Sequence, residues 1–399
     1  MKRLFRYWLF LAAFSALLGT VGIPAASSGS HLPKNPGTRA RNVILMVADG
    51  LGIAGVTAAR IYKNGLDGPP LHMELHNVGY QRTYSADSTV TDSAAAASAW
   101  ACGEKFRQGE ICLHAQSQTH PVSILEWAGT KGKATGLVAT STITHATPAA
   151  FASHVSSRKC ETEIARQYIR VSRPDVILGG GRTRFAPGEP DPCGTSGDFL
   201  AEARTGGYCV VYTASGLRGA VDRGAAKILG LFADEGLTPE MRRTPGISEP
   251  SLREMTAAAL ETLERNPRGF FLLVEGSQID WANHLRDLEY QVSEILAFDQ
   301  AVKTVLDWMN AKPSRKAATL LIVLSDHETG GFAVHGPKDR LTARGMHIEP
   351  GWSFPPGEFP KGGHTGEDTP VWSVGPGSRL LNRPAMESTE IFQVMKSVL

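Results

Sequence analysis

Short apolar runs alternate with amphipathic segments along most of the chain. The run Asn42 to Ala48 (NVILMVA) is apolar throughout, which is typical of a strand buried on both faces, and the amphipathic segment Ile53 to Asn64 predicts a helix after it. Further strands are expected at 134–140, 175–178, 208–212, 227–232, 269–274, 317–324 and 371–374, and further helices at 251–265, 285–310 and 387–398. This alternation predicts the α/β class, with a central, mostly parallel sheet sandwiched between helices.

One stretch, Val90 to Trp100 (VTDSAAAASAW), places a single reactive-looking hydroxyl, Ser93, ahead of a run of alanines. Alanine favours helix, so we expect Ser93 at a helix N-terminus, where unpaired N–H groups and the helix dipole favour an anion. Ordinary capping of the helix is the alternative reading of such a serine. The stretch therefore indicates anion chemistry only in combination with other residues.

Polar side chains come directly after several of the predicted strands. Asp49, Glu275 and the pair Asp326-His327 each follow an apolar run. Ligands of open α/β sheets bind beyond the carboxyl ends of the strands, so these groups are expected to converge on one cleft. For Asp49, capping of the next helix is the alternative.

Two further segments offer metal ligands. Asp280 and His284 are four residues apart, so on a helical turn they share one face and suit zinc. His364 lies between glycines in a loop. A surface Asp–His pair and a lone loop histidine are the alternatives when each segment is taken by itself.

The composition narrows the class of protein. The chain has 399 residues, of which 42% are hydrophobic, and this suits a globular α/β protein. Its formal net charge is only +2, and no basic stripe or aromatic–basic alternation marks a nucleic-acid-binding protein.

The N-terminus has the pattern of a secretory signal peptide. Three cationic residues precede the apolar segment Trp8 to Leu18, and small residues follow at a suitable cleavage distance. We expect a signal peptide at 1–28, a flexible leader at 29–41 and a catalytic domain at 42–399, which makes the protein periplasmic or secreted. Cleavage would change the net charge from +2 to −1 and leave no membrane segment. An uncleaved anchor is the alternative.

Five cysteines make disulfides plausible in an exported protein. Cys102 with Cys112 is the first choice of pair and Cys193 with Cys209 the second, which leaves Cys160 unpaired. Spacing alone does not fix the connectivity. None of the cysteines has CxxC spacing, so a cysteine zinc site is not expected.

Taken together and in order, these segments resemble the alkaline phosphatase family from residue 42 to about residue 376. The matching motifs are Asp49-Gly50, Thr91 to Ala95 (TDSAA), Ala146 to Ala149 (ATPA), His154 to Cys160 (HVSSRKC), Asp175 to Gly181 (DVILGGG), Val274-Glu275-Gly276 with Asp280 and His284, Ser325 to Gly331 (SDHETGG) and His364-Thr365-Gly366. Each motif is short, but their joint occurrence in the family's order is highly specific.

The resemblance implies two Zn²⁺ ions and one Mg²⁺ ion. The implied ligands are Asp280, His284 and His364 for the first zinc, Asp49, Asp326 and His327 for the second, with Ser93 as its reactive ligand, and Asp49, Thr147 and Glu275 for the magnesium. Arg158 matches the arginine that binds the phosphoryl oxygens of the substrate, which suits its planar pair of donors. A surface arginine is the alternative for Arg158 without the motif.

The implied activity is hydrolysis of phosphate monoesters at alkaline pH through a phosphoserine intermediate on Ser93. Metal coordination lowers the pKa of the hydroxyl, and two metal ions hold the attacking and leaving oxygens of an in-line displacement. The family also implies a homodimer. A phosphodiesterase or sulfatase of the same superfamily is an alternative, and a non-catalytic metal- or phosphate-binding protein is an alternative of another class.

Two residues depart from one common family pattern. His145 stands where many members have an aspartate near the third metal, and Trp281 stands where some have a lysine or histidine. Imidazole is softer than carboxylate, so the third site is also compatible with Zn²⁺ or Co²⁺. The loss of a cation at Trp281 removes a phosphate contact, so we expect weaker retention of phosphate and faster product release than in a lysine-bearing relative.

Overall fold

The computed structural model describes residues 39–336, 349–353 and 363–399, which belong to one compact unit. The predicted signal peptide (1–28) and most of the predicted leader (29–41) lie outside the described residues. Among the helices that are described, none combines the length and the apolar character needed to span a bilayer.

A ten-stranded sheet forms the core, in the order β14-β2-β13-β8-β1-β7-β3-β4-β6-β5. The strands are β1 (Asn42–Ala48), β2 (Asn77–Arg82), β3 (Ala134–Thr142), β4 (Val176–Gly180), β5 (Cys209–Val211), β6 (Ile228–Leu231), β7 (Phe270–Gly276), β8 (Thr319–Leu324), β13 (Thr369–Val374) and β14 (Met386–Glu387). Within this sheet only β13 runs against its neighbours, so the predicted mostly parallel sheet is confirmed. The central strands β1, β7 and β8 are buried along their whole length, which explains their continuous apolar sequences.

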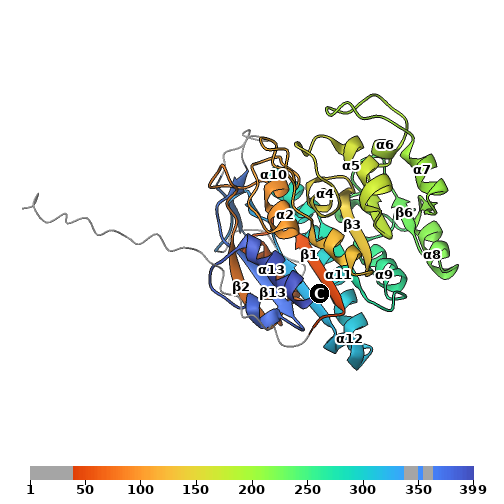
Figure 1. Ribbon diagram of the computed structural model, residues 1–399. Coiled ribbons are helices and arrows are strands. Elements are labelled where there is room, and N and C mark those ends of the chain that lie inside the picture. The colour runs from red at the N-terminus through yellow and green to blue at the C-terminus, as the bar shows by residue number, and fades with distance from the viewer. Residues whose placement is uncertain (1–38, 337–348, 354–362) are drawn as a thin grey trace, which may run out of the picture. The chain divides into compact units, whose positions relative to one another are not determined.

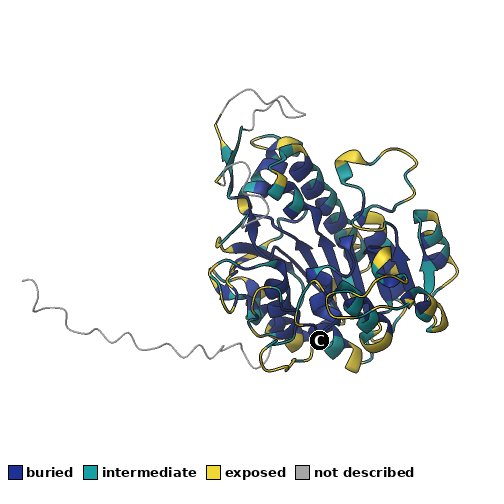
Figure 2. Cartoon of the chain, turned by 90° about the horizontal axis from the view of Figure 1, so that it is seen from above, coloured by how far each residue is buried: buried dark blue, intermediate teal, exposed yellow. Residues whose placement is uncertain are grey.

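Helices cover both faces of the sheet (Figure 1). One face packs against α1 (Ile53–Asn64), α8 (Ala214–Asp222), α9 (Leu252–Leu263) and α11 (Leu288–Asn310), and the other against α2 (Ser93–Cys102), α3 (Ile124–Thr130), α4 (Ala146–Ala152) and α13 (Ser388–Val398). The shorter helices are α5 (Glu161–Gln167), α6 (Arg182–Phe185), α7 (Phe199–Thr205), α10 (Gln278–Leu285) and α12 (Pro313–Ala317). Burial follows this layering, since the strands in the middle are dark blue and the exposed positions gather in loops and on outer helix surfaces (Figure 2).

The single long helix predicted at 285–310 is wrong in its first residues. The structure has two helices there, because Arg286 adopts a left-handed backbone conformation with φ of 56° and ends α10. The side chain of Asp287 then caps α11 by accepting from the backbone N–H groups of Glu289 and Tyr290. This break separates a short helix that carries site residues from a long helix that packs on the sheet.

The Pro- and Gly-rich stretch 336–363 contains a strand among its described residues. Strand β11 (Glu349–Trp352) pairs with β10 (Phe332–His335) in an antiparallel ribbon, and β12 (His364–Thr365) pairs with β9 (Glu328–Thr329). His364 therefore lies in a short strand that is hydrogen-bonded to the segment after Asp326-His327, and not in a free loop. The rest of the stretch lies outside the described residues.

The cysteine pairing is confirmed for one disulfide and wrong for the other. Cys102 and Cys112 are bonded as predicted. Cys193, however, is bonded to Cys160, and Cys209 is a free thiol on β5. The loop that carries Cys193 is tied to the start of α5, next to Cys160, by the carboxylate of Asp191, which accepts from the backbone N–H of Glu163. Tertiary contacts of this kind decide the pairing and leave no trace in the spacing.

Candidate active site

The predicted residues meet at the carboxyl ends of the central strands. Asp49 follows β1, and Glu275 lies at the end of the neighbouring strand β7. Gly50 allows this convergence, because it has φ of +76° and any Cβ there would lie 2.7 Å from the backbone of Asp280. The Asp-Gly pair thus lets α10 approach the end of β1 closely.

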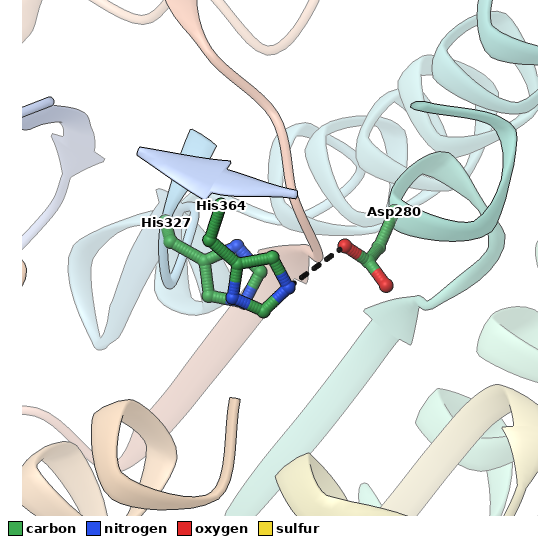
Figure 3. A group of neighbouring side chains, drawn as sticks. All are labelled: Asp280, His327 and His364. Carbon is green, nitrogen blue, oxygen red and sulfur yellow. Dashed lines mark ion pairs between the residues drawn. The ribbon is translucent and has the colours of Figure 1, made fainter. Parts of the chain in front are cut away.

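Two groups of side chains have the arrangement of metal sites. Asp280, His327 and His364 form one group, and Asp49, Asp326 and His327 form the other; within each, one ligand atom of every residue lies within 4.8 Å of the others. In the first group Asp280 reaches in from α10, while the rings of His327 and His364 stack face to face (Figure 3). His327 belongs to both groups, so the two positions are adjacent.

His284 joins the first group. The Nε2 atoms of His284 and His364 lie 3.3 Å apart, and they lie 3.3 and 3.5 Å from Oδ1 of Asp280. Three ligand atoms of two types thus surround one point, as the (i, i+4) spacing of Asp280 and His284 on α10 predicts. The other ring nitrogen of His364 contacts the carbonyl oxygen of Thr91 at 2.9 Å, which fixes the ring plane.

The second group lies beside the candidate nucleophile. Nε2 of His327 is 3.1 Å from Oδ2 of Asp326 and 3.8 Å from Oδ1 of Asp49. Oγ of Ser93 lies 3.3 Å from the same His327 nitrogen. The hydroxyl, the imidazole and two fully buried carboxylates therefore lie next to one another.

Ser93 is the first residue of α2, as predicted, but it is not the cap. Asp92 caps the helix, and its Oδ1 accepts from the backbone N–H of Ala95. The hydroxyl of Ser93 is thus left free of the capping role that was the alternative reading. It stands at the positive end of a fully buried helix, where an anion is favoured.

Arg158 is positioned by the same aspartate. Its Nη1 donates to Oδ2 of Asp92 at 3.0 Å, and its Nη2 donates to Nε2 of His145 at 3.1 Å. The ring of Trp281 meets His145 edge to face at 6.4 Å between centroids. Arg158, His145 and Trp281 therefore form a continuous wall that ends at the cap of the Ser93 helix.

A third group consists of oxygen ligands. Both carboxylate oxygens of Asp49 and of Glu275, and the hydroxyl of Thr147, are buried without a hydrogen-bond partner among the described residues. Thr147 lies on α4, which packs against β7. Unpaired buried carboxylates are costly, so this set of hard oxygen donors fits a bound cation such as Mg²⁺.

The pKa shifts distinguish carboxylates with histidine partners from carboxylates without a cationic partner. Burial raises the pKa of Asp49 well above its usual range, and the charges of Asp326 and Asp280 add to the effect. Burial also raises the pKa of Glu275 to about 7. For Asp280, burial alone would raise the pKa, but His364 and His284 hold it well below its usual range. The carboxylates of the third group lack such partners.

His145 is neutral at alkaline pH. Its burial, together with the charge of Arg158, lowers the pKa to about 4. A guanidinium only donates, so Nε2 of His145 is the acceptor in this contact and the ring proton lies on Nδ1, which has no partner among the described residues. In this arrangement His145 presents a donor, and not a lone pair, toward its surroundings.

Several supporting residues were missed by sequence reasoning. The hydroxyl of Thr329 donates to Oδ1 of Asp280 at 2.6 Å and lies 3.1 Å from Nδ1 of His327, so it bridges the two metal groups. Buried Glu328 accepts from the hydroxyl of Thr365, next to His364. Asn283 holds the carbonyl of Gly50 at 2.8 Å. Only the motif around Asp326 hinted at Thr329, and nothing local in the sequence hinted at Asn283.

Comparison with known proteins agrees with this geometry. A model of the alkaline phosphatase family matches residues 40–349. Alkaline phosphatase 3 of Bacillus subtilis is 38% identical over 332 residues, which cover 81% of this chain and 68% of that protein. Streptomycin-6-phosphate phosphatase of Streptomyces griseus is 34% identical, and the match covers 96% of each chain. An alkaline phosphatase from the Antarctic bacterium TAB5 superposes with a TM-score of 0.76 and 32% identity over 90% of this chain and 98% of that one. A variant of that protein with one histidine replaced by aspartate has Mg bound in its M3 site and gives the same TM-score.

Proposed function

The chain belongs to the alkaline phosphatase family, and from this premise we propose that Ser93 carries the phosphoryl group during turnover. The hydrolysis of phosphate monoesters by a metal-dependent phosphoric monoester hydrolase follows from the family itself. The proposal concerns which residues of this chain perform the steps. It rests on the position of Ser93 at the N-terminus of α2, with its hydroxyl 3.3 Å from Nε2 of His327.

The proposed metal ligands follow the three groups. Asp280, His284 and His364 hold one Zn²⁺; Asp49, Asp326 and His327 hold the second; Asp49, Thr147 and Glu275 hold one Mg²⁺. Bound there, such ions lower the pKa of a hydroxyl or water and offset the charge of a leaving oxygen. The mixed imidazole–carboxylate sets suit zinc, and the oxygen-only set suits magnesium.

The reaction has two displacements. Oγ of Ser93 attacks phosphorus, the bond to the ester oxygen breaks, and the alcohol leaves with a proton. Water then attacks the phosphoserine, which frees Ser93 and inorganic phosphate. Arg158 holds two phosphoryl oxygens through both displacements, because Asp92 and His145 fix the plane of its guanidinium. Because His145 is neutral, Asp92 is the one anionic partner of this guanidinium among these two contacts, and positive charge remains for the phosphoryl group.

For the third site we favour Mg²⁺ over the softer ions that an imidazole ligand would admit. The support is the tautomer of His145, whose lone pair accepts from Arg158 and whose Nδ1 carries the proton. A ring in that state has no lone pair left for a metal ion, so the oxygen atoms of Asp49, Thr147 and Glu275 would hold the ion. Metal analysis of the pure protein tests this; stoichiometric Zn²⁺ or Co²⁺ in place of Mg²⁺ would contradict it.

The central test compares Ser93→Ala with Ser98→Ala, a serine one turn further along the same helix. The hydroxyl of Ser98 donates to the carbonyl of Glu110, accepts from the backbone N–H of Cys112 and contacts none of the proposed metal ligands, so this variant controls for the loss of a buried hydroxyl of α2. We expect a radiolabelled phosphoenzyme in the wild type and in Ser98→Ala, and none in Ser93→Ala. A covalent phosphoenzyme in the Ser93 variant would overturn the assignment of the nucleophile.

Rates with a monoester, a diester and a sulfate ester of the same phenol separate the remaining alternatives. We expect hydrolysis of the monoester to dominate and to disappear on chelation. Faster turnover of the diester or the sulfate would favour another branch of the superfamily. Absence of hydrolysis by the metal-loaded protein would favour a non-catalytic binding role.

A narrower substrate is the second candidate. The streptomycin-6-phosphate phosphatase match spans 96% of both chains, whereas the Bacillus match covers 68% of its partner. A phosphorylated aminoglycoside is therefore a specific monoester worth comparing. A kcat/KM for streptomycin 6-phosphate at least tenfold above that for p-nitrophenyl phosphate would support it, and equal values would favour a general phosphatase.

We also propose that residues 1–28 are removed on export, that 42–399 form the catalytic domain and that the enzyme is a periplasmic or secreted homodimer. The two disulfides suit an oxidising compartment. N-terminal sequencing of the exported protein tests the cleavage. The mass in solution tests the dimer, for which a monomer at working concentration is the contrary result.

A further inference from the structure

A cavity lined by cations opens at the edge of the sheet opposite to the candidate active site. Its volume is about 420 Å³, and its lining includes Arg39, Lys131, Lys133, Arg268 and Lys396, with Trp127 in the wall. Ser397 and Leu399 complete the lining. Even with a carboxylate at Leu399, the cavity keeps a surplus of four positive charges.

The topology explains why these residues meet. Arg39, Lys133 and Arg268 precede β1, β3 and β7, which are neighbours in the order β1-β7-β3. Parallel strands bring their amino ends to one edge, and the last turn of α13 adds Lys396. The intervening strands have 7 to 9 residues, which separates this cavity from the candidate active site by roughly 25 Å.

The cations are held in place without counter-ions. None of the five makes an ion pair with another described residue. The ammonium groups of Lys131 and Lys396 lie 4.3 and 4.7 Å from the centre of the Trp127 ring. Nζ of Lys133 donates to the carbonyl oxygens of Arg41 and Arg268, at 2.7 and 3.0 Å. Packing and neutral acceptors thus orient three of the five positive charges.

Lys133 is less exposed than the other cations of the cavity, and its burial disfavours the charged form. Burial lowers the pKa of Lys133, and the nearby charge of Arg41 lowers it further. The chain as a whole has a formal net charge of only +2, so the cluster does not reflect a generally basic surface. An adjoining cavity that shares Trp127 and Lys396 has Glu104, Val122 and Phe392 in its lining and no other cation, so hollows on this side are not cationic by default.

We propose that the cavity binds a compact anion that carries several phosphate groups. A single phosphate is too small to contact cations distributed around about 420 Å³, whereas a polyphosphorylated molecule contacts most of them. The concave shape favours such a ligand over a flat membrane surface. Lysine and arginine together suit phosphate, as point charges and as planar donors respectively.

The test titrates the metal-loaded enzyme with myo-inositol hexasulfate, a polyanion without phosphate esters to hydrolyse. Saturating inorganic phosphate fills the active site throughout, and calorimetry and tryptophan fluorescence report binding. We expect saturable binding that weakens at least tenfold in the double variant Lys396→Gln/Arg268→Gln and weakens with salt. The double variant Lys303→Gln/Arg253→Gln, which removes one lysine of α11 and one arginine of α9 outside the cavity, is the charge-matched control and should bind like the wild type.

The kinetic readout separates this cavity from catalysis. Hydrolysis of p-nitrophenyl phosphate and the thermal unfolding temperature should be the same in the double variant and the wild type. Absence of saturable binding, or equal affinity in the double variant, overturns the proposal. Binding to vesicles of anionic lipid that needs the same two cations, without binding of the hexasulfate, would assign the surface to membranes and also overturn it.

Discussion

The carboxyl edge of the central sheet carries buried negative charges, whereas its amino edge carries exposed positive charges. At the carboxyl edge, Asp49 and Glu275 are completely buried and lack hydrogen-bond partners among the described residues. At the amino edge, Lys131, Arg268 and Lys396 are exposed, so water solvates them. A buried charge without a partner requires a tightly bound counter-ion, whereas an exposed charge only favours one. The first edge is therefore built for metal ions, and the second for a ligand whose binding depends on salt.

The largest effect is expected from Asp49→Asn, which removes a charge shared by two metal groups. Activity should fall by about 10³-fold or more, because both positions lose a ligand. The metal-free protein should instead gain about 1–3 kcal/mol of stability, because an uncompensated buried charge disappears. Urea unfolding of the chelated proteins at pH 8 and metal titration measure both quantities.

The gain in stability of the metal-free Asp49→Asn variant depends on pH. The pKa of Asp49 is higher in the folded protein than in the unfolded chain, so the metal-free wild type loses stability as pH rises above the ordinary carboxyl range. The advantage of the asparagine variant should therefore grow with pH and vanish near pH 4. A metal-free variant that is less stable than the wild type at pH 8 would contradict the charge argument.

A smaller loss is expected from Thr329→Val, which removes the hydroxyl between Asp280 and His327 and keeps the shape. The affinity for zinc should fall about 10- to 100-fold, the usual effect of losing a group that orients metal ligands. Thr329→Ser retains the hydroxyl and should restore most of the affinity. Competition with a chromogenic chelator measures it, and equal affinities for the valine and serine variants would exclude an orienting role.

Trp281→Lys tests the role of the side chain next to His145 and should lower the inhibition constant for phosphate by about 3- to 10-fold. An added cation near His145 should tighten the binding of inorganic phosphate and slow its release. Trp281→Phe keeps an aromatic ring and adds no charge, so it is the control. An inhibition constant for phosphate that is unchanged or higher in the lysine variant would count against the predicted role of Trp281.

The smallest effect is expected at Glu163, a carboxylate that accepts hydrogen bonds from three side chains. Burial alone would raise the pKa of Glu163, but hydrogen bonds from Arg166, Gln167 and Thr195 lower it to about 2. The contribution of ionised Glu163 to the free energy of unfolding is complete above the ordinary glutamate pKa and is lost as pH falls toward 2. Because the group is largely solvent-screened, Glu163→Gln should cost only about 1 kcal/mol at pH 7.

Unfolding of this variant at two pH values sharpens the contrast with Asp49. The cost of Glu163→Gln should shrink to less than half at pH 3, which is the opposite trend to that of the Asp49 variant. A cost that is equal at pH 7 and pH 3 would show that packing, and not charge, sets the contribution of Glu163.

Local sequence patterns predicted the parts of the fold and site that depend on neighbours along the chain. The apolar run before Asp49 and the helical spacing of Asp280 and His284 each have a local cause, and the structure has both features. The sheet edge was harder to predict, because β2 alternates buried and exposed positions without a long apolar run. Thr329 gains its contacts only through folding, so its sequence position carried no independent signal.

Contacts between segments that are distant in the sequence explain the features that the sequence did not predict. The partner of Cys193 depends on how one loop packs against α5, and the cationic cavity is assembled from Lys131, Arg268 and Lys396, which are far apart in the sequence. None of these associations has a periodicity or a motif. The resemblance to a family supplied the metal grouping in advance, but it said nothing about the opposite edge.

The bond between Cys102 and Cys112 is linked to Arg158 through a few contacts. It anchors the loop in which the Gly109 N–H donates to Asp92, the cap of the Ser93 helix, and the Gly109 carbonyl accepts from the backbone of Arg158. Formation of this disulfide thus helps to position the guanidinium of Arg158, the proposed phosphate ligand. In a reducing compartment the proposed metal ligands would still be in place, but Arg158 would be held less firmly, so we expect full activity only after transfer to an oxidising compartment.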